Sequence, residues 1–111
     1  MSNVINFSEL LSSDIGWEFE GYKFNKTEIS FLIIDAPPGG GPKLHSHPYA
    51  EILIIQEGNG RFTLGDKIIE ASGGQIIIVP PNTPHKFNNT GSGSLRQIDI
   101  HMSPAIITRW L

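Results

Sequence analysis

Four residues of the chain have the side-chain types and the spacing of a divalent metal site. His45 and His47 are separated by a single residue, Glu51 follows after three more residues, and His85 lies farther along the chain. Imidazole nitrogens and carboxylate oxygens are common ligands of zinc, iron, nickel and manganese in proteins. These four residues are therefore candidates for one metal site, provided that the fold brings them together.

The His45–His47 pair fits a β-strand. Residues at positions i and i+2 of a strand point to the same face, with Cβ atoms roughly 6–7 Å apart. Two imidazoles at that separation can converge on one ion, with nitrogen–metal distances of about 2.0–2.2 Å. We predict that this pair supplies two neighbouring ligands.

Glu51 can reach the pair only if the chain bends after His47. On one continuous strand it would lie about 20 Å from His45, at ~3.3 Å per residue. Because Pro48 interrupts a strand ladder, we expect a bend at 48–50 and a return as a neighbouring strand about 4.8 Å away. His85 must come from a third strand, and the turn PPNTP at 80–84 predicts that this strand begins at His85.

Short apolar runs separated by turn residues predict the elements that position these ligands. The runs are rich in Ile, Val, Phe and Thr, and 12 glycines and 8 prolines are spread between them. This pattern is typical of an all-β sandwich or barrel. The predicted strands cover 17–24, 28–35, 51–57, 61–65, 67–71, 75–80, 84–89 and 95–102. We also expect two short terminal helices, one at 7–12 and one that starts at Ser103-Pro104 and runs toward Leu111.

Length and composition indicate one ordinary globular domain over residues 1–111. The chain is 39% hydrophobic and 17% charged, with a net charge of −3 and no cysteine. A weakly acidic chain does not attract phosphates, so we expect no nucleic-acid partner. No apolar run approaches the ~20 residues that cross a bilayer, and the N-terminus does not resemble a signal peptide, so we expect no membrane partner. The absence of cysteine fits a cytoplasmic protein.

The sequence around the four candidate ligands resembles the two motifs of the cupin superfamily. GGGPKLHSHPYAEILIIQEG is similar to the first motif, a glycine, five residues, His-x-His, three residues, Glu, six residues and a glycine. GQIIIVPPNTPHKFNN is similar to the second motif, which is a glycine, five residues, proline, one residue, glycine, two residues, His, three residues and Asn. The motif positions are Gly39, His45, His47, Glu51, Gly58, Gly74, Pro80, His85 and Asn89.

One position departs from the second motif, since Asn82 replaces its glycine. Asn adopts left-handed backbone angles more readily than most residues, so we expect the turn to be kept. The resemblance implies a small conserved-barrel cupin, that is, a jelly-roll barrel or double-stranded β-helix. It implies that His45, His47, Glu51 and His85 bind one divalent ion of manganese, iron, nickel or zinc, and that the protein forms a homodimer. A barrel that keeps these residues without binding metal is the alternative.

Several residues near the ligands could face either the pocket or solvent. Gln97, Asp99 and His101 occupy one face of a predicted strand and Arg96, Ile98, Ile100 and Met102 the other, and the pattern does not decide which face points inward. Tyr49 could cover the metal or pack at the rim. We expect Leu53, Ile55 and Phe87 to line the barrel because they alternate with Glu51 and His85. Gly39, Gly40 and Gly41 predict a loop at the mouth, because no helix start follows them.

The ligand set limits the function. Three neutral imidazoles and one carboxylate give a divalent site a net charge of about +1, which favours an anionic or enolisable oxygen ligand. An octahedral ion would keep two positions for substrate, dioxygen or water, whereas a tetrahedral zinc would be closed. We therefore expect a metal-dependent enzyme acting on a small organic molecule, such as a dioxygenase, isomerase or decarboxylase. The alternative is a non-catalytic module that binds or senses a small ligand, and it would lack DNA contacts because no helix-turn-helix is evident.

Overall fold

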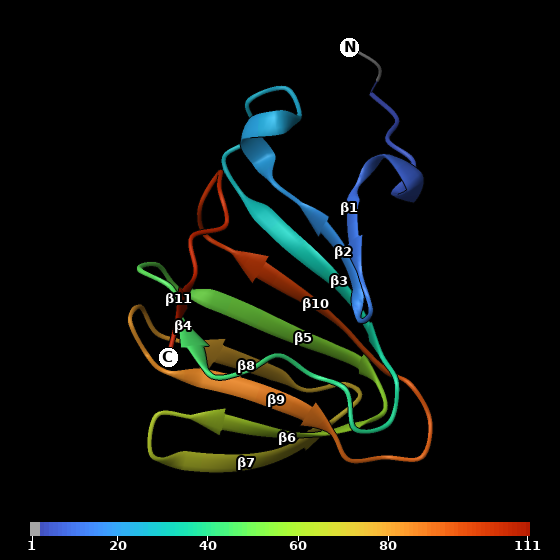
Figure 1. Ribbon diagram of the computed structural model, residues 1–111, viewed down its shortest axis with the longest axis vertical. Helices are drawn as coiled ribbons and strands as arrows, with labels where there is room; N and C mark the ends of the chain where they lie inside the picture. Colours follow the sequence, from blue (N-terminus) through green and yellow to red (C-terminus); the bar gives the residue numbers. More distant parts are fainter. Residues whose placement is uncertain (1–2) are drawn as a thin grey trace.

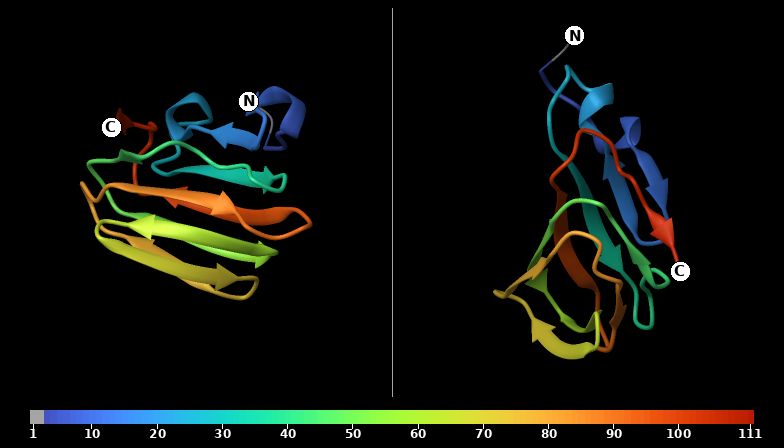
Figure 2. Two further views of the ribbon diagram at one scale, coloured as in Figure 1. Left: turned by 60° about the horizontal axis from the view of Figure 1, so that its bottom comes forward. Right: turned by 90° about the vertical axis from the view of Figure 1, so that its left-hand side faces the viewer.

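The computed structural model describes residues 3–111 and consists almost entirely of short antiparallel strands in two sheets (Figure 1). The strands are β1 (Leu11–Ser13), β2 (Gly16–Phe19), β3 (Ser30–Ala36), β4 (His45–Ser46), β5 (Glu51–Glu57), β6 (Asn59–Leu64), β7 (Lys67–Ser72), β8 (Ile76–Val79), β9 (His85–Asn89), β10 (Leu95–His101) and β11 (Arg109–Trp110). The larger sheet has the order β1-β2-β3-β10-β5-β8, and the smaller has the order β11-β4-β9-β6-β7. The two sheets face each other (Figure 2), so the predicted all-β sandwich or barrel is confirmed.

The apolar core lies between the sheets because each central strand alternates buried and exposed side chains. Leu53 and Ile55 on β5, Phe62 on β6 and Phe87 on β9 belong to one buried cluster. The prediction that Leu53, Ile55 and Phe87 line the barrel is therefore confirmed. Toward one end of this interior the buried side chains change from apolar to polar, and the candidate ligands lie there.

The two predicted terminal helices need correction. Residues 103–111 form no helix; they are irregular up to β11, which pairs with β4 through Trp110 and His45. At the other end, a single 3-10 turn, η1 (Phe7–Glu9), precedes β1. A second 3-10 turn, η2 (Gly21–Lys23), ends the strand predicted at 17–24 early. Strand pairing at the open edges of the sheets outweighs the local propensity of the terminal segments for helix. None of the helices within residues 3–111 is long and apolar enough to cross a bilayer.

The chain bends after His47 as predicted, but Glu51 does not return on a neighbouring strand. β4 belongs to the smaller sheet and β5 to the larger one. Glu51 therefore faces the histidines across the interior. His85 is the first residue of β9 and pairs directly with His45, as the turn at 80–84 predicts.

Three residues hold the segments around β9 in place. Asn82 has φ 59 and donates its backbone N–H to the carbonyl of His47 at 2.7 Å, so the left-handed turn is kept as expected. Gly41 runs so close to β9 that a Cβ would collide with the carbonyl oxygen of Phe87. The buried Asn89 side chain donates to the carbonyls of Ala36 and Gly93, both at 2.8 Å, and joins two loops. The motif residues at 82 and 89 thus have a structural role here.

Candidate metal centre

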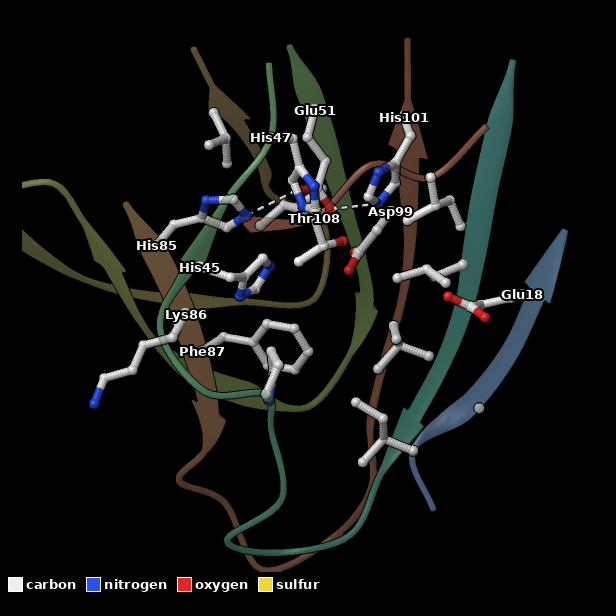
Figure 3. A pocket seen from close by; sticks show the side chains of 18 of the residues that line it. Glu18, His45, His47, Glu51, His85, Lys86, Phe87, Asp99, His101 and Thr108 are labelled. Carbon is white, nitrogen blue, oxygen red and sulfur yellow. Dashed lines mark hydrogen bonds and ion pairs between the residues drawn. The ribbon is translucent and has the colours of Figure 1, made fainter. Parts of the chain in front are cut away.

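The four candidate ligands converge on one point between the sheets. One ligand atom from each of His45, His47, Glu51 and His85 lies within 4.8 Å of every other, and all four residues are buried. Figure 3 shows the side chains of His45 and His85 on the left of the view, next to those of His47 and Glu51, which overlap near its centre. These residues come from β4, the segment after it, β5 and β9, so the group exists only in the folded chain.

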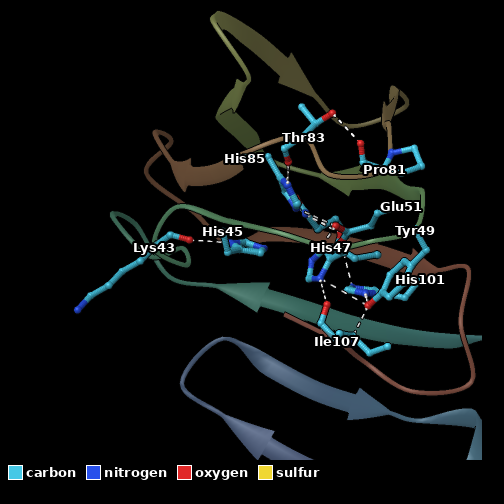
Figure 4. Close-up of polar contacts among 12 residues, drawn as sticks. Lys43, His45, His47, Tyr49, Glu51, Pro81, Thr83, His85, His101 and Ile107 are labelled. Carbon is cyan, nitrogen blue, oxygen red and sulfur yellow. Dashed lines mark hydrogen bonds and ion pairs between the residues drawn. The ribbon is translucent and has the colours of Figure 1, made fainter. Parts of the chain in front are cut away.

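Backbone carbonyls fix the orientation of the three imidazoles. Nδ1 of His45 lies 2.6 Å from the carbonyl oxygen of Lys43, and Nδ1 of His85 lies 2.8 Å from that of Thr83. Nδ1 of His47 lies 2.8 Å from the carbonyl oxygen of Ile107 (Figure 4). A carbonyl can only accept, so each Nδ1 carries the proton and donates it. The neutral rings are thereby assigned the tautomer whose Nε2 lone pair faces the centre, the arrangement that metal-binding histidines commonly have.

Glu51 lies at the centre of this group. Its Oε1 is 2.9 Å from Nε2 of His85 and 3.4 Å from Nε2 of His47, while its Oε2 is 3.1 Å from Nε2 of His101. Burial alone would raise the pKa of the Glu51 carboxyl, but the three histidines around it lower that pKa well below its usual range. For His85, burial lowers the pKa and the contact with Glu51 raises it, with a net increase. Glu51 is therefore an anion that attracts positive charge to this point.

His101 and Tyr49 extend the group, and the sequence pattern did not single out this pair. His101 is 1% exposed and its Nδ1 lies 2.7 Å from the hydroxyl of Tyr49. That hydroxyl accepts the backbone N–H of Ile107 at 3.1 Å. Nδ1 of His47 already donates to the Ile107 carbonyl, so Nδ1 of His101 is the acceptor for the hydroxyl proton. His101 then carries its proton on Nε2, which is the tautomer opposite to that of the three candidate ligand histidines. An Nε2–H is not a metal ligand, and this one faces Oε2 of Glu51, although it is not aligned for a hydrogen bond.

The residues present fit a divalent metal ion. Nε2 of His47 is buried with no hydrogen-bond partner, which is costly unless an ion or a water occupies that direction. Burial, more than the nearby histidines, lowers the pKa of His45 to about 4, which favours the neutral imidazole that a metal requires. Three nitrogens and one carboxylate oxygen suit manganese, iron, nickel or zinc.

A cavity of about 300 Å³ adjoins the centre. Gln97, Asp99 and His101 all face inward and are buried, which settles the orientation of β10. Asp99 lines the cavity and accepts a hydrogen bond of 2.8 Å from the Gln97 amide. Burial, together with the charge of Glu51, raises the pKa of Asp99 well above its usual value. The buried face of this strand carries three polar residues and the other face carries Ile98 and Ile100, so hydrophobic periodicity alone could not assign the inward face.

Comparisons with known proteins agree with this fold. A family model described as a Cupin domain matches residues 32–101, which is more than half of the chain. An uncharacterised protein of Methanocaldococcus jannaschii is 38% identical over 76 residues, which cover 68% of this chain and 59% of that protein. The HTH-type transcriptional activator RhaS of Escherichia fergusonii is 27% identical over 81 residues, which cover 73% of this chain and 29% of the activator.

Solved structures of oxalate decarboxylases share the architecture. A Bacillus subtilis oxalate decarboxylase, described as having Mn(II) centres, superposes with a TM-score of 0.83 at 21% identity, covering 95% of this chain and 31% of that one. The Lactobacillus farciminis enzyme in complex with formate gives a TM-score of 0.81 at 20% identity, covering 94% and 34%. At this level of identity the likeness shows the fold alone. The chain spans less than two thirds of the length of each of these relatives.

Proposed function

The chain belongs to the Cupin domain family, and we propose that it is a metal-dependent enzyme in which His45, His47, Glu51 and His85 bind one divalent ion. The observation that carries this proposal is the convergence of the four ligand atoms within 4.8 Å in a buried site beside a cavity. The three imidazoles bind through Nε2 because their Nδ1 protons are committed to backbone carbonyls. Glu51 supplies the negative charge that stabilises the cation.

The cavity supports chemistry rather than a purely structural ion. When bound, a divalent ion acts as a Lewis acid that polarises an oxygen of the substrate. The protein contributes a largely apolar cavity, which excludes water around a bound molecule and strengthens electrostatic interactions there. A small organic molecule is the expected substrate, and oxygen insertion, isomerisation or decarboxylation are the reaction types that such a site supports.

A reconstitution experiment tests this proposal. The protein would be stripped with a chelator, reloaded separately with manganese, iron, nickel or zinc, and screened for oxygen uptake and for turnover of small carbonyl and carboxylate compounds. We expect at least one loaded form to show turnover that His85→Ala lacks. An ion that binds but supports no turnover in any form would contradict the enzymatic proposal and leave metal binding intact.

A non-catalytic sensing module is the second candidate function. The similarity to the transcriptional activator RhaS, at 27% identity over 81 residues, favours it. Such a module would be stabilised by its ligand, because a ligand that binds the native state raises the free energy of unfolding. Ligand-dependent thermal stabilisation without turnover would support this candidate over the enzyme.

The outer face of the larger sheet supports a homodimer. On this face, apolar side chains of β3, β10, β5 and β8 lie side by side in two rows. Ile76 and Ile78 on β8 are both 63% exposed. The rows consist of Ile33, Ile98, Ile54 and Ile76, and of Phe31, Ile100, Ile52 and Ile78. Contiguous apolar surface of this kind marks association, and self-association through one such face gives a two-fold dimer. We place this assembly in the cytoplasm, in line with the absence of cysteine.

A further inference from the structure

Most of the cavity wall beyond the ligands is apolar. The side chains that carry this surface come from both sheets and from the C-terminal segment: Leu32, Ile34, Leu53, Phe62, Phe87 and Trp110. The cavity of about 300 Å³ lies at the lower end of the range typical of small-molecule sites, about 300–1,000 Å³. A molecule that only contacted the metal ligands would leave this surface in contact with water. The wall therefore favours an apolar body attached to the group that binds the ion.

The charges around the cavity restrict what the ion-binding group can be. Glu18 and Asp99 lie in register on either side of Leu32 along the inner face of the larger sheet, and both line the cavity. Among the described lining residues, Lys86 is the one with a cationic side chain. Figure 3 shows that its amine points away from the ligands. The wall thus offers carboxyl groups and no cation to pair with a bound anion.

A divalent ion with Glu51 leaves about one positive charge for the bound molecule to neutralise. A second negative charge would be buried without a partner, and burying an unpaired charge costs far more than burying a paired one. We propose that this cavity selects an apolar molecule that presents a pair of oxygens carrying a single negative charge, and that it rejects small dianions. This inference rests on the proposed metal site and adds the substrate class to it.

Three related probes, which differ in charge or in one apolar ring, test the inference on manganese-loaded wild-type protein. Oxalate is a dianion, oxamate is its singly charged isostere, and N-cyclohexyloxamate adds an apolar ring to oxamate. Calorimetry gives each Kd, which is then divided by the Kd of the same probe for free aqueous Mn(II). The two tryptophans, Trp17 and Trp110, both line the cavity, so quenching of their fluorescence reports occupancy independently of any activity.

We expect N-cyclohexyloxamate to bind at least about tenfold more tightly than oxamate on this corrected scale, and oxamate more tightly than oxalate. A corrected affinity for oxalate that equals or exceeds that for oxamate would overturn the inference. So would failure of all three probes to bind while manganese is bound. If manganese itself does not bind, the proposed metal site fails, which is a distinguishable result.

Two pairs of variants locate the selectivity on the wall. Leu32→Asn should remove most of the advantage of the cyclohexyl ring, whereas Ile33→Asn, on the opposite face of β3, should keep it. Glu18→Lys should raise the affinity for oxalate relative to oxamate by about tenfold. The matched change Glu28→Lys, at an exposed position with the same change in net charge, should not. Equal effects of the paired variants would assign the selectivity elsewhere and overturn the inference.

Discussion

The hydroxyl of Tyr49 lies 2.7 Å from Nδ1 of His101, and this contact decides which nitrogen of His101 faces the centre. The hydroxyl accepts from Ile107, so it donates to His101 and leaves the ring proton on Nε2, beside Oε2 of Glu51. Tyr49 also stacks on His47, with ring centroids 5.3 Å apart. The pair therefore contacts Glu51 at Oε2, whereas His85 and His47 approach Oε1.

Loss of the Tyr49 hydroxyl should weaken metal binding. Tyr49→Phe removes the donor that fixes His101, the residue that contacts the candidate ligand Glu51. Groups that orient metal ligands typically contribute about 10–100-fold to affinity. We predict about tenfold weaker binding in a competition titration against a coloured chelator. Tyr22→Phe, at an exposed tyrosine, is the matched control.

A double-mutant cycle shows whether Tyr49 acts through His101. In a His101→Leu background, Tyr49→Phe should have little further effect on metal affinity, because the residue it positions is gone. Melting of the metal-free proteins separates this effect from a loss of stability. Additive losses in the double mutant would contradict the positioning role of Tyr49.

The left-handed turn at Asn82 should tolerate glycine and disfavour alanine. Asn82 has φ 59, a conformation that costs residues with a Cβ roughly 1–2 kcal/mol and that glycine adopts freely. We predict that Asn82→Ala lowers the free energy of unfolding by about 1 kcal/mol, whereas Asn82→Gly changes it little. Urea denaturation of the metal-free proteins measures both. A larger loss for glycine than for alanine would mean that the asparagine side chain, not the backbone, stabilises the turn.

Glu20 should contribute stability that depends on pH. Its carboxylate accepts the N–H of Ile106 at 3.0 Å and lies 3.0 Å from Nζ of Lys23. Burial raises the pKa of Glu20, but these two contacts outweigh it and hold the pKa below the ordinary value of 4.5. Because the folded-state pKa is depressed, the contribution is fully present above pH 4.5 and is lost as the pH falls through the folded-state value.

The corresponding measurement compares Glu20→Gln with wild type across pH. We predict a loss of about 1 kcal/mol at neutral pH, because the contact is charged but its Lys23 end is exposed to solvent. The difference should shrink toward zero under acid conditions. Denaturation curves in the presence of a chelator give both values, and Glu28→Gln serves as an exposed control. A difference that grows as the pH falls would contradict the assignment.

Charge on the outer face of the larger sheet should break the proposed dimer. Ile78→Lys places an ammonium group without a partner in the proposed interface, where its burial is costly. We expect light scattering to show dimeric wild type and monomeric Ile78→Lys. Ile68→Lys changes an isoleucine of similar exposure, 68%, on the other sheet and should stay dimeric. A monomeric wild type at micromolar concentration would rule out the dimer.

The strands and the candidate ligand group could be predicted because each corresponds to a recognisable local pattern in the sequence. The run 51–57 has the bounds of β5, and the spacing of His45, His47, Glu51 and His85 belongs to a motif that reflects the fold. Two features of the structure have no such local pattern. The strand β11 forms because Trp110 meets β4 across the sheet edge, and Glu51 faces the histidines from the opposite sheet. Tertiary pairing decides both of these features. It also decides the inward orientation of His101, which lies on a strand that could face either way.

Metal content of the purified protein, measured by mass spectrometry without prior exposure to chelators, is the most direct test of the proposed centre. We predict one divalent ion per chain in the wild type and none in His47→Ala, because that substitution removes one of four converging ligands. Circular dichroism should show that His47→Ala keeps the β-rich fold, since the core cluster does not include His47. Full metal occupancy in a folded His47→Ala protein would contradict the assignment of the metal centre.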